Sequence, residues 1–153
     1  MAQNKQEAGS HRTVRDVMTP NPASVSEIDS IQRVAEIMKR EDAGVVPVVD
    51  GRKVIGMITD RDIVVRLIAE GKDPSNAKVT EAMSKQVRAV KEDTPINLVL
   101  ELMSREQIRR VPVTNTNNEL VGIVSIGDIA TDSKEIVKVG RTVEEISEAP
   151  PNN

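Results

Sequence analysis

Hydrophobic residues recur along the chain with two different periods, and these periods predict helices and strands in alternation. Between residues 31 and 38 the spacing is three and four residues, which is typical of a helix with one buried face. The residues on that face are Ile31, Val34, Ala35, Ile37 and Met38. Asp29 is a suitable N-cap for this helix, and the helix is expected to end near Gly44.

Two apolar runs, 45–49 and 54–59, follow this helix and predict a β-hairpin, because the turn pair Asp50-Gly51 separates them. A second helix is expected from about Asp60 to Ile68. A short strand at 23–25 precedes the first helix. The order predicted for this half of the chain is therefore β-α-β-β-α.

The second half of the chain repeats this order. The stretch Gly56-Met57-Ile58-Thr59-Asp60-Arg61-Asp62-Ile63 returns as Gly122-Ile123-Val124-Ser125-Ile126-Gly127-Asp128-Ile129. Met18 matches Met83 at a shift of 65 residues, and one inserted residue in the turn at 115–118 makes the later shift 66. Thr94 is expected to cap the helix of the second repeat, with Pro95 in its first position. Two copies in one order indicate an internal duplication.

The predicted fold class is α/β (α+β), built from two β-α-β-β-α repeats. The segments, in chain order, are a flexible arm at 1–12, repeat one at 13–71, a connector at 72–77, repeat two at 78–132, and a C-terminal segment with its tail at 133–153. A repeat of about 50 residues has a marginal core. We therefore expect the two repeats to pack together with pseudo-twofold symmetry, which leaves a cleft on either side of their contact. Part of the C-terminal segment is expected to form a strand or helix that covers the first repeat.

Composition narrows the classes of function. The chain has 153 residues, of which none is aromatic and none is cysteine, and its only histidine is His11. Its net charge is −3. Aromatic stacking on nucleic-acid bases is therefore impossible, and no excess of positive charge favours nucleic acid or an anionic membrane. One histidine without cysteine cannot build a conventional zinc site. The absence of cysteine fits a cytoplasmic protein, and no apolar run approaches the ~20 residues that span a bilayer.

The candidate chemistry lies in the duplicated stretch, where Thr59 precedes Asp62 and Ser125 precedes Asp128 by three residues. An ionised carboxylate can accept hydrogen bonds from both hydroxyls of a ribose, and a hydroxyl at a helix start suits a phosphate. The same spacing is a capping box, which would stabilise a helix without any ligand. One carboxylate can serve both purposes. No nucleophile–base pair, metal cluster or Walker-type glycine loop is apparent, so the sequence does not predict an enzyme.

With these motifs in order and repeated, residues 14–130 resemble a tandem pair of cystathionine-β-synthase-type (CBS) domains, a Bateman module. The segments that carry the resemblance are 17–19, 46–50 and 56–63, with their counterparts 83–84, 110–113 and 122–129. Residues 59–66 and 107–113 resemble the small stand-alone bacterial CBS-pair proteins of the hypoxic response protein type. The resemblance implies adenosine-containing ligands in the clefts between the repeats and dimerisation into a flat disc through helices.

The resemblance also implies which residues line each cleft. The first cleft would comprise Thr19, Asn21, Ala23, Ala43 and Gly44, with Ser125 and Asp128 from the second repeat. The second would comprise Gln86, Arg88, Ile108 and Arg109, with Thr59 and Asp62. Small residues in the first cleft leave room for adenine, whereas the arginines of the second either grip phosphates or fill the pocket. Arg61 and Arg110 are further phosphate-binding candidates.

The expected function is a regulatory module that senses adenine nucleotides (AMP, ADP or ATP) and signals through a homodimer. No cofactor is required, although Mg²⁺ can accompany a bound nucleotide. A protein partner is expected that the sequence does not identify, and no nucleic-acid or membrane partner is expected. The alternative is a ligand-free dimeric scaffold that presents a protein-interaction surface, with both turns serving only as helix caps.

Overall fold

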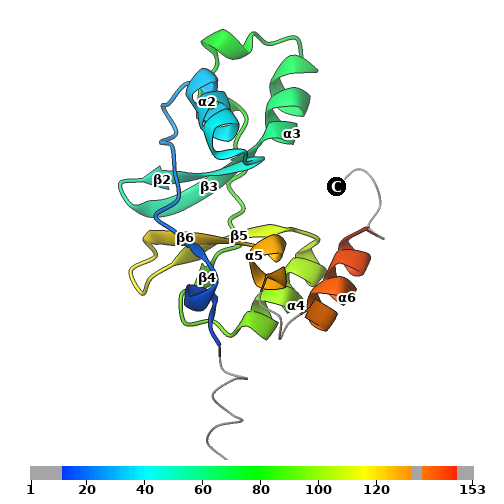
Figure 1. Ribbon diagram of the computed structural model, residues 1–153. Helices are drawn as coiled ribbons and strands as arrows, with labels where there is room; N and C mark the ends of the chain where they lie inside the picture. Colours follow the sequence, from blue (N-terminus) through cyan, green and yellow to red (C-terminus); the bar gives the residue numbers. More distant parts are fainter. Residues whose placement is uncertain (1–11, 132–135, 148–153) are drawn as a thin grey trace, which may run out of the picture. The chain divides into compact units, whose positions relative to one another are not determined.

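The computed structural model describes residues 12–131 and 136–147, and of residues 136–139 it describes the backbone alone. The chain divides into two compact units, each described by itself (Figure 1). The first-repeat unit comprises Pro22–Arg88 and Asn117–Leu120. The second-repeat unit comprises the described residues up to Asn21, Ala89–Thr116 and those from Val121 on. The expected N-terminal arm up to residue 11, which includes His11, and the tail at 148–153 lie outside the described residues.

The first-repeat unit has the predicted order of elements. Val25 makes an isolated parallel bridge with Val48 and takes the place of the first strand. The elements that follow are α2 (Ile31–Glu41), β2 (Val45–Asp50), β3 (Lys53–Thr59), α3 (Asp60–Ile63) and a π-helical turn η2 (Val64–Ile68). Strands β2 and β3 pair antiparallel, and α2 and α3 contact each other and the hairpin on one side (Figure 1). The short 3-10 helices η3 (Pro74–Asn76) and η4 (Val79–Glu81) complete the unit.

The second-repeat unit has the same order in a four-stranded sheet. Its elements are η1 (Val14–Asp16), β1 (Thr19–Pro20), β4 (Val90–Lys91), α4 (Ile96–Glu106), β5 (Arg110–Thr114), β6 (Leu120–Ser125), α5 (Ile126–Ala130) and α6 (Ile136–Ser147). The strand order is β1-β6-β5-β4, with β1 antiparallel to β6 and β4 parallel to β5. This mixed arrangement of strands and helices confirms the predicted α/β class.

The strand register is the same in both units once the shift of the duplication is applied. Thr19 pairs with Ile123, and the matching residues Ser84 and Met57 form an antiparallel bridge. Val90 likewise pairs with Val113 as Val25 pairs with Val48. The segment that opens each repeat in the sequence therefore packs on the strands of the other repeat. Each compact unit consequently contains most of one repeat together with the opening segment of the other.

Two glycines make this exchange of opening segments possible. A Cβ at Gly56 would lie 2.7 Å from the carbonyl oxygen of Ser84 and 2.8 Å from Cε of Met83. A Cβ at Gly122 would collide with the sulfur of Met18. Separations below 3.0 Å are essentially never found for real Cβ atoms, so each crossing requires glycine. The methionines, unbranched and flexible, fill the space above these strands.

Each unit has its own aliphatic core. In the first-repeat unit the fully buried residues include Val34, Val46, Ile58, Leu67 and Val79. In the second-repeat unit they include Val14, Val99, Met103, Val113 and Ile129. Val14 and Val79 occupy matching positions in the two opening segments. Their burial shows that the exchanged segments are part of the cores.

Three sequence predictions about helices were wrong in detail. Ser30, not Asp29, is the N-cap of α2, since its hydroxyl accepts from the backbone N–H of Arg33, while the Asp29 carboxylate accepts from Ser26 N. Helix α4 begins at Ile96, so Pro95 lies at the cap position and Thr94 lies before it. The C-terminal segment forms α6, and α6 packs against α4 and α5 rather than the first repeat (Figure 1).

Candidate functional site

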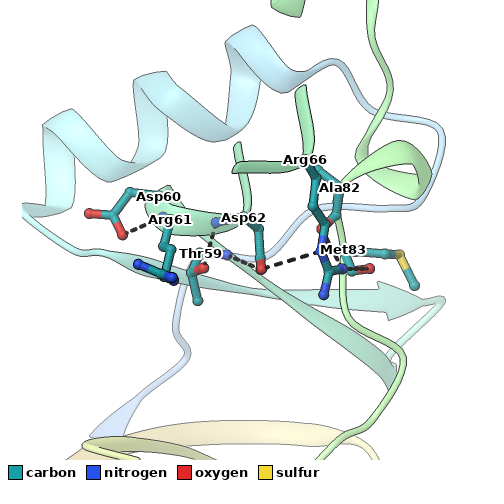
Figure 2. A network of polar contacts seen from close by, with 7 residues as sticks. All are labelled: Thr59, Asp60, Arg61, Asp62, Arg66, Ala82 and Met83. Atoms are coloured by element: carbon teal, nitrogen blue, oxygen red, sulfur yellow. Dashed lines mark hydrogen bonds and ion pairs between the residues drawn. The ribbon is translucent and has the colours of Figure 1, made fainter. Parts of the chain in front are cut away.

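The strand β3 ends in a turn that fixes the Asp62 carboxylate by two reciprocal hydrogen bonds. The backbone N–H of Thr59 donates to Oδ2 of Asp62 at 2.9 Å, and the backbone N–H of Asp62 donates to Oγ1 of Thr59 at 3.0 Å (Figure 2). This is a complete capping box. The Asp62 side chain is 18% exposed, so it is held in place yet still reaches solvent.

The turn after β6 has the same geometry. Ser125 N donates to Oδ2 of Asp128 at 2.9 Å, and Asp128 N donates to Oγ of Ser125 at 3.0 Å. Both carboxylates are half-buried. The duplication has therefore preserved the position of a hydroxyl and a carboxylate at two strand-to-helix junctions.

A backbone contact from the preceding loop fixes each turn. Asp60 N donates to the carbonyl oxygen of Gly44 at 3.0 Å, and at the matching positions Ile126 N donates to the carbonyl oxygen of Arg109 at 2.9 Å. A Cβ at Gly44 would lie 3.3 Å from Oδ2 of Asp60, a tight separation that favours glycine there. The loop after the first helix of each repeat thus lies against the hydroxyl–carboxylate turn of the same repeat.

The structure sorts the predicted site residues into two sets, one in each unit. The first-repeat unit holds Ala23, Ala43, Gly44, Thr59, Arg61, Asp62 and Arg88. The second-repeat unit holds Thr19, Asn21, Ile108, Arg109, Arg110, Ser125 and Asp128. Each predicted cleft draws residues from both sets, so the grouping into clefts stays a prediction.

In the second-repeat unit, Thr19 and Asn21 lie beside the strand that carries Ser125. Thr19 pairs with Ile123 of β6, and Asn21 N donates to the carbonyl oxygen of Val121 at 3.1 Å. Asn21 has a φ of 49°, in the left-handed region that asparagine tolerates better than most residues. Both residues are exposed; Thr19 lies opposite the middle of β6, and Asn21 lies near its start, away from Ser125.

The candidate phosphate-binding arginines are all exposed: Arg61, Arg88, Arg109 and Arg110. Arg61 follows Asp60, whose Oδ1 accepts from the Arg61 backbone N–H at 2.8 Å. Arg110 is the first residue of β5 and Arg109 precedes it. The arginines of each unit therefore lie close in sequence to its turn or to the loop that contacts it, except Arg88, which ends the long segment of the first-repeat unit.

Sequence reasoning missed Arg66, which the structure places beside Asp62. Its Nε lies 3.8 Å from Oδ1 of Asp62, and its Nη1 donates to the carbonyl oxygens of Ala82 and Met83 at 3.0 and 2.9 Å (Figure 2). The spacing of four residues from Asp62 on a helix was a signal that could have identified the ion pair. No feature of the sequence indicated the two carbonyl contacts.

The described residues offer neither a metal-binding cluster nor a helix that could span a membrane. In the part of the chain that the structure describes, no three acidic or histidine side chains gather where they could hold a metal ion. Over the same residues, every helix is too short or too polar to span a bilayer.

The fold and the two turns define a tandem-repeat α/β module in which each unit presents one hydroxyl–carboxylate pair. The chain belongs to the CBS domain family, whose family model matches residues 14–69 and 79–135. The predicted tandem pair is thereby confirmed. The CBS match indicates no catalytic family.

Similar proteins agree with this assignment. Hypoxic response protein 1 of Mycobacterium tuberculosis is 37% identical over 119 residues, which cover 77% of this chain and 82% of the relative. A crystal structure of Hypoxic Response Protein I with two coordinated zinc ions matches 78% of this chain and 98% of its own, at 36% identity and a TM-score of 0.73. The CBS domain pair of protein MJ0100, in complex with 5′-methylthioadenosine and S-adenosyl-L-methionine, matches 80% of this chain and 99% of its own, at 30% identity and a TM-score of 0.71.

The zinc ions belong to that relative, and this chain is poor in the residue types that usually bind zinc. It contains one histidine and no cysteine, whereas protein zinc sites are built mainly from these two residue types. The residues of this chain therefore do not fit a zinc site of the usual kind.

Proposed function

We propose that this protein is a regulatory module that binds adenosine-containing ligands of the AMP, ADP and ATP class in the clefts between its repeats. The observation that carries the proposal is the pair of matching turns, Thr59–Asp62 and Ser125–Asp128, in a CBS pair. A similar CBS pair in complex with two adenosine compounds supports the ligand class. The protein is non-enzymatic, because regulation requires only binding and release.

The hydrogen-bonding capacity of the carboxylates supports a ribose as the anchored group. In each turn the cap uses Oδ2, and a carboxylate has about four acceptor positions on its two oxygens. Oδ1 and the second lone pair of Oδ2 remain for the vicinal hydroxyls of a ribose. The cap holds the carboxylate in place before the ligand arrives, which lowers the entropic cost of binding.

The remaining features of the proposal follow the family. Ala23, Ala43 and Gly44 suit the base side of one cleft because they are small, and the exposed arginines suit phosphates. Mg²⁺ accompanies a nucleotide polyphosphate where one binds. The protein acts in the cytoplasm as a homodimer that passes ligand occupancy to a protein partner.

Calorimetric titration with AMP, ATP and S-adenosylmethionine tests the proposal. The variants are Asp128→Asn and Asp62→Asn, in which the amide oxygen can still accept the cap hydrogen bond while the charge is lost. The matched control is Asp16→Asn, because Thr13 N donates to Oδ2 of Asp16 at 3.0 Å in a third turn of the same type outside the predicted site. We expect at least one site variant to weaken binding about tenfold or more, since hydrogen bonds to charged groups contribute about 1.5–3 kcal/mol.

A thermal measurement gives an independent readout of the same binding. Ligand at 100 times its dissociation constant stabilises the folded protein by about 2.7 kcal/mol. If none of the three compounds produces heat or a shift in melting temperature, the regulatory proposal fails. Equal loss of affinity in Asp16→Asn and the site variants would also contradict it.

The second candidate is the ligand-free dimeric scaffold, and one observation favours it. Both turns are complete capping boxes, so each carboxylate has a structural role that needs no ligand. Under this alternative, the cap-retaining asparagine variants would change neither stability nor partner capture.

A further inference from the structure

Arg66 joins three groups that belong to two different segments of the first-repeat unit. It lies in the π-helical turn η2, and its Nη1 donates to two successive carbonyl oxygens, those of Ala82 and Met83. Its Nε faces Oδ1 of Asp62 at 3.8 Å, beyond hydrogen-bond distance but within ion-pair range (Figure 2). One guanidinium therefore spans the gap between the candidate binding turn and the segment at 82–88.

The segment to which Arg66 donates packs in the core, pairs with β3 and leads to a candidate site residue. Ala82 and Met83 are buried against the core of the unit. Ser84 exchanges two backbone hydrogen bonds with Met57 of β3, at 2.8 and 3.0 Å. The segment then continues to Arg88, a candidate site residue, after which the chain enters the second-repeat unit. The segment at 82–84 is therefore bonded both to Arg66 and to β3, the strand that leads into the candidate turn.

The chemistry of the contact requires arginine. Two carbonyl oxygens from consecutive residues match two hydrogens on one guanidinium nitrogen, and the planar group keeps its other edge toward the carboxylate. Lysine could reach one carbonyl but would not hold both groups in fixed directions. π-helical turns are rare, and they occur frequently at functional sites.

The second repeat does not repeat this arrangement. At the shift that relates the two turns, the residue matching Arg66 is Asp132, which lies outside the described residues. A carboxylate has no hydrogen to donate to the carbonyls of Val17 and Met18, the residues that match Ala82 and Met83. Among the described residues, no cation pairs with Asp128 as Arg66 does with Asp62. In the described residues, an arginine therefore connects the turn after β3 to the opening segment of the other repeat, and the turn after β6 has no such arginine.

We propose that Arg66 is a positioning residue that couples the Asp62 carboxylate to the segment at 82–88. The inference rests on the proposed function, because Asp62 is the group that would accept a ligand hydroxyl. The ion pair leaves Oδ1 of Asp62 without a hydrogen bond, so a ligand hydroxyl can donate to this oxygen. The ligand then competes with Arg66 for the negative charge of the carboxylate, which orients Arg66. Occupancy of the turn after β3 then changes the order of the segment that leads out of the unit. Among the described residues, no arginine links the turn after β6 to the segment at 17–18 in this way.

Hydrogen exchange of individual backbone amides, followed by NMR on the full chain without ligand, tests the coupling directly. We expect Arg66→Gln to accelerate exchange of the Ser84 amide about tenfold or more, because two hydrogen bonds from a charged donor are lost. Asp62→Asn should accelerate it by a smaller factor, and Asp62→Asn added to Arg66→Gln should have no further effect. Arg66→Lys should restore only part of the protection, because lysine can reach one carbonyl oxygen but cannot hold both groups in fixed directions.

The matched control is Arg33→Gln, since Arg33 also forms an ion pair four residues away, with Asp29 at 3.9 Å, but its side chain donates to no carbonyl oxygen in the contacts of the described residues. Equal Ser84 exchange in Arg66→Gln and Arg33→Gln would overturn the proposal, as would additive effects of the Asp62 and Arg66 substitutions.

A second arm adds AMP, which should slow exchange at 82–88 in the wild type and not in Arg66→Gln. If AMP binds and leaves 82–88 unchanged in the wild type, coupling is refuted. If none of AMP, ATP and S-adenosylmethionine produces heat, the proposed function fails, while the ligand-free arm still decides the role of Arg66.

Discussion

Replacing Gly56 with alanine should destabilise the first-repeat unit severely, although the change adds one methyl group. The new Cβ would lie 2.7 Å from the carbonyl oxygen of Ser84 and 2.8 Å from Cε of Met83. The methionine side chain can move aside, but the Ser84 carbonyl is part of the backbone and is bonded to Met57 N at 3.0 Å. The segment must therefore move away from β3.

The cost can be worked out from the contacts that this movement breaks. The bridge between Met57 and Ser84 consists of two backbone hydrogen bonds, each contributing about 0.5–1.5 kcal/mol. Overpacking of a well-filled core typically costs about 1–3 kcal/mol in addition. Because the segment can relieve the clash by giving up the bridge, the two costs partly overlap. We expect Gly56→Ala to lower the free energy of unfolding by about 2–4 kcal/mol.

Urea unfolding at 25 °C measures this change, followed by far-ultraviolet circular dichroism because the chain has no aromatic residue for fluorescence. The matched control is Gly51→Ala, where no atom lies within 4 Å of the new Cβ. That substitution places alanine at a φ of 64° and should cost only about 1 kcal/mol through backbone strain. The close crossing of the segment at 83–84 over β3 would be refuted by either of two results. One is a loss of unfolding free energy below about 0.5 kcal/mol in Gly56→Ala, and the other is a loss in Gly56→Ala no larger than the loss measured for Gly51→Ala.

Three further predictions concern single positions. Gly140→Ala in α6 should stabilise the protein by up to about 1 kcal/mol, because nothing lies within 4 Å of the new Cβ and alanine favours helix. Urea unfolding measures this gain, and any destabilisation would contradict the open surroundings of Gly140. Ser125→Ala should cost about 1 kcal/mol in the same assay by removing a helix cap, and Ser125→Thr should restore most of it. Ser75→Ala should raise the pKa of Asp73, which the side-chain hydrogen bond from Ser75 and then its backbone N–H hold below 3.8. A lowered pKa stabilises the fold fully at neutral pH, and this contribution disappears as the pH falls below about 4 through the folded pKa; NMR titration of the carboxyl group shows the shift, and an unchanged pKa in Ser75→Ala contradicts the assignment.

The elements of both units were predictable because the same pattern occurs twice. The spacing from Ile31 to Met38 and the runs on either side of Asp50-Gly51 correspond to α2, β2 and β3. Helix starts were displaced by one residue at Ser30 and Ile96, where several polar or proline residues in succession can each take the cap position. Local preference does not distinguish between such neighbours, and tertiary contacts decide.

The exchange of the opening segments could not have been predicted, and the duplication itself is the reason. Met18 and Met83 are chemically identical and so are Gly56 and Gly122, so either methionine could cover either glycine in the same register. Hydrophobic pattern fixes which face of a strand is buried. It does not fix which copy of a duplicated segment covers that face.

The position of α6 had a signal in the sequence that the apolar spacing alone did not reveal. Leu100 of α4 matches Ala35 of α2, and Leu100 is 4% exposed whereas Ala35 is exposed. The larger side chain lies on the part of α4 that faces α6, where Leu100 and Thr142 line the same groove of about 480 Å³. Val143 and Ile146 of α6 complete the packing on this core. The repeat with the extra apolar surface is the one that the last helix covers, since burial of that surface is what stabilises the contact.

The two turns show how a duplicated module can have equal geometry and unequal chemistry. Backbone contacts from Gly44 and Arg109 fix the turns, and these contacts do not depend on side-chain type, so both copies keep the same distances. Arg66 comes from the helix beyond the turn, where the second copy has a different residue, and it changes the charge next to Asp62 without moving the carboxylate. Since the guanidinium is 48% exposed, the ion pair itself contributes little to stability, and the two carbonyl contacts account for most of its structural effect. The two copies thus keep the hydrogen bonds that build the turn, while the group that faces the Asp62 carboxylate is particular to the first.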